Sequence, residues 1–199
     1  MPISNDSLRA AIEEIIAAVN NRNYTALQSR VDLTEFVNLG YDDAIDQLAI
    51  NCEEFHAKYP DDLLFQFGAQ ALRDYNAKYR LVHIGFIFAV INAYFDSNLD
   101  ESARFEQNPI AFAATHLKKL IAELQSEIVT GVVEGDRASV SIKIRAELIG
   151  ELTFRLGMRL DEGRWRVIRI ENADELVRPI VDIGEKIWPR EWDRGMKIN

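Results

Sequence analysis

The sequence is poor in cysteine, and this excludes several kinds of site. Cys52 is the only cysteine among 199 residues, so the chain can form neither an internal disulfide nor a cysteine-based metal cluster. The three histidines, His56, His83 and His116, are too far apart for a zinc motif of the His-Glu-x-x-His type. Neither a phosphate-binding Gly-x-x-x-x-Gly-Lys loop nor a Gly-x-Ser-x-Gly nucleophile motif occurs. We therefore expect no metal ion and no cofactor.

The chain also lacks a long apolar run and an excess of positive charge. Its most apolar stretch, residues 81–95, is 15 residues long and contains His83 and Asn92, whereas a bilayer span needs about 20 apolar residues. This stretch predicts a buried core helix and no membrane span. The formal net charge of −9 argues against a nucleic-acid partner, because phosphate binding favours a basic surface.

The first residues do not form a signal-peptide pattern, because residues 1–6 contain no basic segment followed by an apolar run. The sequence as given therefore favours a cytoplasmic protein. An extracytoplasmic location would require that a leader had been removed.

Apolar residues recur at three- and four-residue spacing through the first two-thirds of the chain, which is typical of amphipathic helices. Leu8, Ile12 and Val19 are the first such series. Asn108-Pro109 is the strongest start signal, since asparagine caps a helix and proline suits its first position. The predicted helices cover residues 7–19, 24–30, 33–59, 61–95 and 109–125. The helix 61–95 either continues unbroken into its apolar part or has a kink at Gly85.

After about residue 127 the apolar residues recur at every second position instead, which indicates β-strands. The alternation is clear in residues 138–148 and 152–160, and Asp161-Glu162-Gly163 is typical of a hairpin turn. With further strands at 128–134 and 164–170, the pattern predicts a four-stranded antiparallel meander that is apolar on one face.

An apolar sheet face needs a cover, and the preceding helices can supply it. The sequence therefore predicts an α+β fold in which the helical N-terminal two-thirds packs on the C-terminal meander. We expect a single domain over residues 1–184, with a helical layer at 5–126 and the meander at 127–171. Residues 185–199 would form a C-terminal tail.

Two segments resemble sequences of a known group of proteins. The first runs from Val31-Asp32-Leu33 to Tyr41-Asp42-Asp43-Ala44-Ile45-Asp46, and the second is Gly163-Arg164-Trp165-Arg166-Val167. Over residues 5–180 the chain resembles uncharacterised bacterial proteins that are often exported or membrane-anchored. Their C-terminal part is similar to cystatin-like and nuclear-transport-factor-two-like folds, in which a curved, cone-shaped sheet wraps a helix. The resemblance implies this fold, and it brings no catalytic residues.

His83 is the first candidate site residue, because it interrupts an apolar run. One interpretation is a core histidine that makes a single hydrogen bond, since buried polar groups are nearly always paired. The alternative is a titrating group in a pocket with Tyr79 and Asp96, as in cone-shaped isomerases and dehydratases.

The polar face of the meander is the second candidate site. Residues 137–170 hold eight Arg or Lys and four Asp or Glu, a net charge of +4, whereas residues 1–136 have a net charge of −11. The basic residues expected on one face are Lys143, Arg145, Arg155, Arg159 and either Arg164 or Arg166. Like charges on one sheet face repel each other, so we expect them to pair with acids of the same chain. The alternative is a surface that binds an acidic protein or an anionic ligand, and the charge segregation also permits a homodimer.

The tail is the third candidate, because it holds Trp188 and Trp192, and tryptophan is enriched at interfaces. Docking on the protein's own body is one interpretation, and a partner site is the other. These features favour a non-enzymatic binding or accessory module that uses the basic face or the aromatic tail. The alternative is a small-molecule enzyme with a cone-shaped pocket.

Overall fold

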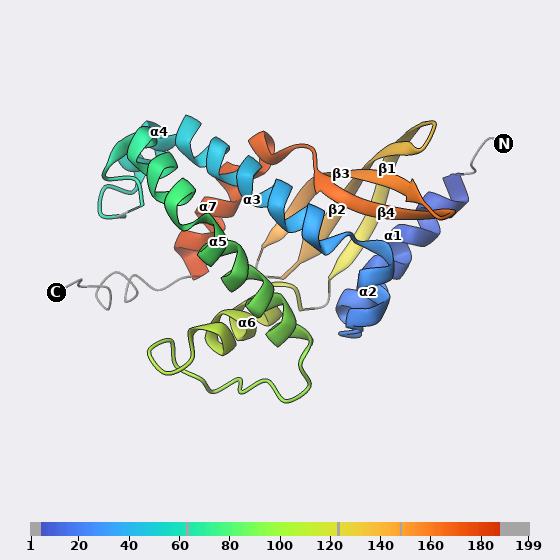
Figure 1. Ribbon diagram of the computed structural model, residues 1–199, viewed down its shortest axis with the longest axis horizontal. Coiled ribbons are helices and arrows are strands. Elements are labelled where there is room, and N and C mark those ends of the chain that lie inside the picture. The colour runs from blue at the N-terminus through green and yellow to red at the C-terminus, as the bar shows by residue number, and fades with distance from the viewer. Residues whose placement is uncertain (1–4, 63, 123, 148, 188–199) are drawn as a thin grey trace. The chain divides into compact units, whose positions relative to one another are not determined.

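The computed structural model describes residues 5–62, 64–122, 124–147 and 149–187, and within them it has seven helices and four strands (Figure 1). Their order is α1 (Asn5–Asn20), α2 (Tyr24–Arg30), α3 (Leu33–Ile50), α4 (Cys52–Lys58), α5 (Gly68–Phe95), α6 (Pro109–Leu120), β1 (Gln125–Glu134), β2 (Arg137–Ala146), β3 (Gly150–Asp161), β4 (Arg164–Ile170) and α7 (Ala173–Ile187). The predicted α+β class, with N-terminal helices packed against a four-stranded antiparallel meander, is confirmed.

The chain divides into two compact units. The sheet unit comprises the residues up to 39 and residues 83–171, and the helical unit comprises residues 40–82 and the residues from 172 onward. Both α3 and α5 therefore contribute residues to both units. That the chain forms one domain stays a prediction.

The strands follow one another in the order β1-β2-β3-β4, each antiparallel to its neighbour. The predicted alternation is confirmed in β2. Val140 and Ile142 are buried, whereas the residues that alternate with them, Ser139, Ser141 and Lys143, are partly exposed. Opposite Val140 and Ile142 on β3 lie Leu156 and Phe154. The hairpin to β4 has positive φ angles at Glu162 (48°) and Gly163 (77°), as a tight two-residue turn requires.

The core of the sheet unit lies between the apolar face of the sheet and α1. Leu8 and Ile12 of α1 are buried, and they belong to one cluster with Met158 and Trp165 of the sheet. Figure 1 shows α1 beside the strands. Burying these side chains gives the sheet the cover that its apolar face needs.

Side chains cap three helix starts. The side chains of Asn23, Asp32 and Asn108 each accept a hydrogen bond from the backbone N–H three residues later, at 3.0 to 3.1 Å. Such a bond satisfies one of the donors that a helix start leaves free. The predicted starts of α2, α3 and α6 are confirmed.

The helices of the helical unit differ from the prediction. The predicted helix 33–59 is interrupted at Asn51, between α3 and α4. The helix predicted from residue 61 begins only at Gly68, because the Asp62 carboxylate accepts the Leu64 N–H at 2.8 Å and forms a local turn. Phe65, which follows that turn, is buried with Cys52, Phe55 and Val177 in the core of this unit.

The apolar run 81–95 is helical, as predicted, but it is not wholly buried. Leu81 is 81% exposed and Val82 is 66% exposed, so the expectation of a buried core helix was wrong for the start of the run. No helix in the described part of the chain is long and apolar enough to span a membrane.

Candidate functional site

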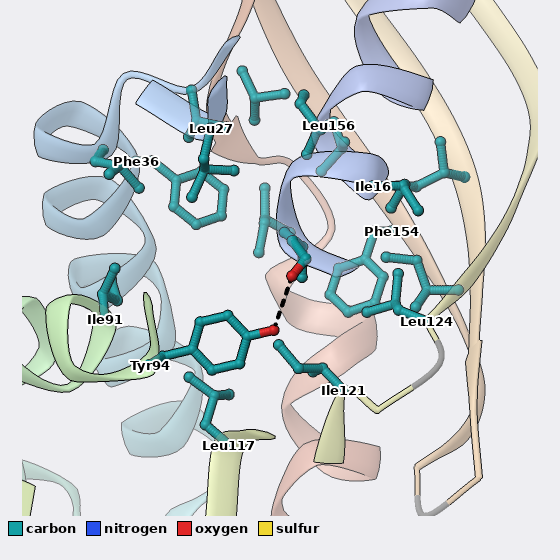
Figure 2. A pocket seen from close by; sticks show the side chains of 18 of the residues that line it. Ile16, Leu27, Phe36, Ile91, Tyr94, Leu117, Ile121, Leu124, Phe154 and Leu156 are labelled. Atoms are coloured by element: carbon teal, nitrogen blue, oxygen red, sulfur yellow. Dashed lines mark hydrogen bonds between the residues drawn. The ribbon is translucent and has the colours of Figure 1, made fainter. Parts of the chain in front are cut away.

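A largely apolar cavity lies in the sheet unit, between the apolar face of the sheet and residues of five helices, α1, α2, α3, α5 and α6 (Figure 2). Its volume is about 280 Å³. Most of the lining side chains are half-buried rather than buried, so the cavity is partly open to solvent. The lining residues, all of them apolar or aromatic, are Ile15, Ile16, Val19, Leu27, Val31, Leu33, Phe36, Ile91, Tyr94, Phe95, Leu117, Ile121, Leu124, Ile142, Ile144, Phe154, Leu156, Val167 and Ile170.

The periodicities of the sequence build these walls. Ile142 and Ile144 are alternate residues of β2, so they share one face of the sheet. Phe154 lies opposite Ile142 on β3, and Leu156, two residues further along β3, lies on the same face. The last turn of α6 contributes Leu117 to the lining. The segment after the helix contributes Ile121 and Leu124, which follow at four- and three-residue spacing. The same residues that predict a core therefore surround an unfilled volume.

The Tyr94 hydroxyl is the one polar side-chain group in the lining. It donates a hydrogen bond to the backbone carbonyl oxygen of Val19 at 3.1 Å, with Leu117 and Ile121 beside it (Figure 2). Burial raises the pKa of this phenol above its ordinary value. Tyr94 therefore stays neutral at physiological pH, and its hydroxyl hydrogen is already donated to the Val19 carbonyl oxygen.

The three candidate catalytic residues do not line the cavity. His83 lies half-buried in α5 and interacts with other groups of the protein, so its interpretation as a fully buried core histidine is wrong. Tyr79 packs its ring 4.8 Å from that of Tyr75, in the helical unit. Asp96 is exposed after the end of α5, where its carboxylate accepts the Asn98 N–H at 2.8 Å. A pocket that joins the three residues stays a prediction.

The basic face of the meander is paired with acids of the same chain. Arg145 Nε lies 2.6 Å from one carboxylate oxygen of Glu151, and Lys143 Nζ lies 3.2 Å from the other. Glu127 of β1 lies 4.0 Å from Arg145. The hydrogen bonds from Arg145 and Lys143 hold the pKa of the Glu151 carboxyl below its ordinary value.

Arg159 pairs with a different element. Its guanidinium lies 2.9 Å from Glu35 and 3.6 Å from Asp32, both at the start of α3. Arg155 is exposed and also makes interactions within the structure. These contacts agree with the pairing interpretation, which the sequence favoured over a binding surface. Trp188 and Trp192 lie outside the described residues.

The described residues contain no group of three or more His, Cys, Asp or Glu side chains that could hold a metal ion. Sequence reasoning offered a cone-shaped pocket only as an alternative and did not identify the residues of this lining, because they come from segments as distant as residues 15 and 170. No single segment carries a signal for it. Comparisons of the chain with known protein families, with curated proteins and with solved structures find no match.

Proposed function

We propose that the chain is a non-enzymatic binding module that holds a small apolar ligand in the cavity of the sheet unit. The observation that carries the proposal is the lining, which is apolar apart from one hydroxyl that is already hydrogen-bonded. A cavity of this character excludes polar and charged groups from its interior, since burying them without partners is costly.

The volume supports an occupant. Ligand sites usually begin at about 300 Å³, and this cavity of about 280 Å³ is close to that size. Because the cavity is partly open, water can reach its apolar lining. A bound apolar molecule would cover that lining, which is favourable by about 25 cal/mol per Å² of apolar surface removed from water.

The alternative, a small-molecule enzyme, has less support. Proton transfer needs an acid or base within hydrogen-bond reach of the substrate, and the lining offers only Tyr94. A binding role for the basic face also has less support. Lys143, Arg145 and Arg159 form ion pairs with acidic residues of the same chain, so their charges are already neutralised. Membership of the exported or anchored bacterial group stays a proposal that rests on the resemblance.

A cavity-filling substitution tests the proposal. Ile16 lines the cavity from α1 (Figure 2), and the neighbouring Ala17 is exposed and does not line it. Ile16→Trp places an indole in the cavity, whereas Ala17→Trp adds the same side chain to the surface of the same helix. We expect calorimetric titration with decanol to show binding to the wild type and to Ala17→Trp.

For Ile16→Trp we expect a loss of affinity of at least about tenfold, because the indole occupies the volume that the alkyl chain would fill. A thermal melt would establish that both variants are folded. Equal decanol affinity in the two variants, or no binding to the wild type, would contradict the proposal.

A further inference from the structure

The sheet has two edges, and the described residues cover only one of them. At the β4 edge, the Asp32 N–H donates to the Val167 carbonyl oxygen at 2.9 Å, and Val31 forms a parallel bridge with Val167. At the other edge, β1 is paired with β2 alone. Within the part of the chain that the structure describes, no hydrogen bond joins the backbone of residues 130–134 to a group outside the sheet. The outward N–H and C=O groups of β1 are therefore available to another strand.

Strand β1 lacks two of the features that usually protect such an edge. Its sequence, QSEIVTGVVE, contains neither lysine nor proline, the residues that discourage pairing with another chain. Its Val132 side chain is apolar and yet 59% exposed. The register of β1 with β2 shifts between Ile128 and Thr130, which makes the first half of the edge irregular. Residues 130–134, the regular half, are therefore the part of the edge that can pair.

A hollow lies beside this regular half. Gly131 is opposite the buried Val140 of β2, so it belongs to the buried face of the sheet but brings no side chain to it. A Cβ atom at this position would meet Val140 Cγ2 at 3.8 Å, an ordinary van der Waals distance. The volume of the hollow is about 160 Å³, and a cavity of about 150 Å³ accepts benzene. There is thus room for a valine side chain of another strand. The lining residues are Leu8, Arg9, Ile128, Val129, Thr130, Gly131 and Val140.

We propose that a second copy of the chain pairs with this edge, so that two β1 strands run antiparallel across a two-fold axis at Val132. This inference goes beyond the proposed function and is independent of the cavity ligand. An axis at Val132 is the one placement that pairs the regular half entirely with itself. Val132 then lies opposite the partner's Val132. Gly131 lies opposite the partner's Val133, and Thr130 lies opposite the partner's Glu134.

The side chains of the edge are complementary in this register. Val133 shares the buried face with Gly131, since alternate residues of a strand point to the same face. The partner's Val133 therefore comes to the hollow that Gly131 leaves, and the two-fold axis repeats this contact. On the exposed face, the two Val132 side chains cover each other as a cross-strand pair.

The charges of the edge also suit a second copy. Glu134 is the only charged residue of the regular half, and it faces Thr130 rather than another acid, so no like charges are opposed. Arg9 of α1 lines the hollow together with Thr130. Its side chain is exposed, and no carboxylate among the described residues forms an ion pair with it. A strand of another protein could pair through its backbone, but this chain itself supplies both the valine and an acid at the required spacing.

Charge variants at the axis test the proposal. Sedimentation equilibrium of the wild type, up to millimolar concentration, should show a reversible monomer–dimer equilibrium, weak because the interface is small. Val132→Lys and Val132→Glu each place like charges across the axis, and each should weaken dimerisation by at least about tenfold. An equal mixture of the two variants should recover the affinity, because opposite charges then face each other. A thermal melt establishes that each variant is folded.

A disulfide tests the register. In Val132→Cys the two thiols face each other across the axis, where opposite residues have Cα atoms about 4.5–5.5 Å apart, as a disulfide requires. Mild oxidation should link this variant into a dimer. The control is Val129→Cys, also at an exposed position, where the two cysteines would be about 20 Å apart along the strands. The native Cys52 is 1% exposed and does not compete.

Three results would overturn the proposal. The first is a wild type that stays monomeric at millimolar concentration. The second is a dimer that Val132→Lys and Val132→Glu leave intact, or whose affinity their mixture does not recover. The third is Val129→Cys linking as readily as Val132→Cys, which would place the interface elsewhere.

Discussion

The Tyr94 hydroxyl and the Val19 carbonyl oxygen, 3.1 Å apart, join α5 to the end of α1 at the boundary of the cavity. The phenol lies in an otherwise apolar wall, and its burial is tolerated because its hydrogen is donated. The same carbonyl also accepts the N–H of Arg22. If the phenol oxygen is removed, the Val19 carbonyl oxygen still accepts a hydrogen bond from Arg22. A substitution at Tyr94 can therefore remove one hydrogen bond without leaving a buried acceptor unpaired.

Tyr94→Phe should lower the free energy of unfolding by about 1 kcal/mol, the usual net value of one hydrogen bond. The fold and the apolar lining should be retained, so decanol affinity should stay the same or rise. Urea denaturation and a decanol titration measure the two effects. An unchanged stability would show that this hydrogen bond contributes nothing in solution.

The core of the sheet unit can be tested at Met158, which is 1% exposed. Met158→Ala should lower the free energy of unfolding by about 2–5 kcal/mol, because it removes buried methylene groups and leaves a cavity. The control is Val132→Ala on β1, where the side chain is 59% exposed. We expect that change to alter stability by less than about 0.5 kcal/mol. Similar losses in both variants would contradict the assigned faces of the sheet.

The pairing on the basic face predicts the result of a charge swap. Arg145→Glu should lower the melting temperature at low salt, because it places a carboxylate beside Glu151. The double variant Arg145→Glu/Glu151→Arg should recover most of the loss by restoring an ion pair in the opposite sense. High salt should shrink the difference, since the groups are exposed. A single variant as stable as the wild type would instead favour a binding surface that tolerates the change.

An ion pair of the helical unit predicts a pH dependence. Arg80 donates two hydrogen bonds to Asp42, at 2.7 and 2.8 Å, and they hold the pKa of Asp42 below its ordinary value of 3.8. Because the folded pKa is the lower one, the stabilisation is fully present above pH 3.8 and is lost as the pH falls through the folded pKa.

The difference in melting temperature between wild type and Arg80→Gln should therefore be constant near neutral pH and shrink below pH 3.8. Arg73→Gln is the matched control, since Arg73 lies 3.8 Å from Asp46 and makes a longer contact. Its effect should be smaller at every pH. A difference for Arg80→Gln that persists at low pH would contradict the role given to Asp42.

Local signals in the sequence predicted much of this fold. Asn108-Pro109 marked the start of α6, and the alternation around Val140 and Ile142 marked the buried face of β2. Both signals depend only on neighbouring residues. The break at Asn51 and the late start of α5 at Gly68 were not predicted. The Asp62 carboxylate accepts the Leu64 N–H in a local turn before α5, and a carboxylate at that position is equally favourable at the helix start that the sequence predicted there.

The candidate site was harder to predict than the fold. His83 was conspicuous because it is polar in an apolar run, yet it does not line the cavity. The lining residues, such as Ile16 and Phe154, have the spacing of ordinary core residues, and only the three-dimensional structure shows that they leave a volume unfilled. Helix α7 was also not predicted, although Asp174 and Glu175 in its first turn are favourable at a helix start.

The most direct test of an apolar-ligand site is a titration with decanol followed through isoleucine methyl resonances. The isoleucines that line the cavity are Ile15, Ile16, Ile91, Ile121, Ile142, Ile144 and Ile170. Ile50, Ile168 and Ile180 do not line it and serve as internal controls. We predict saturable shifts confined to the lining methyl groups. Shifts spread equally over both sets, or no saturable shift in either, would contradict the account.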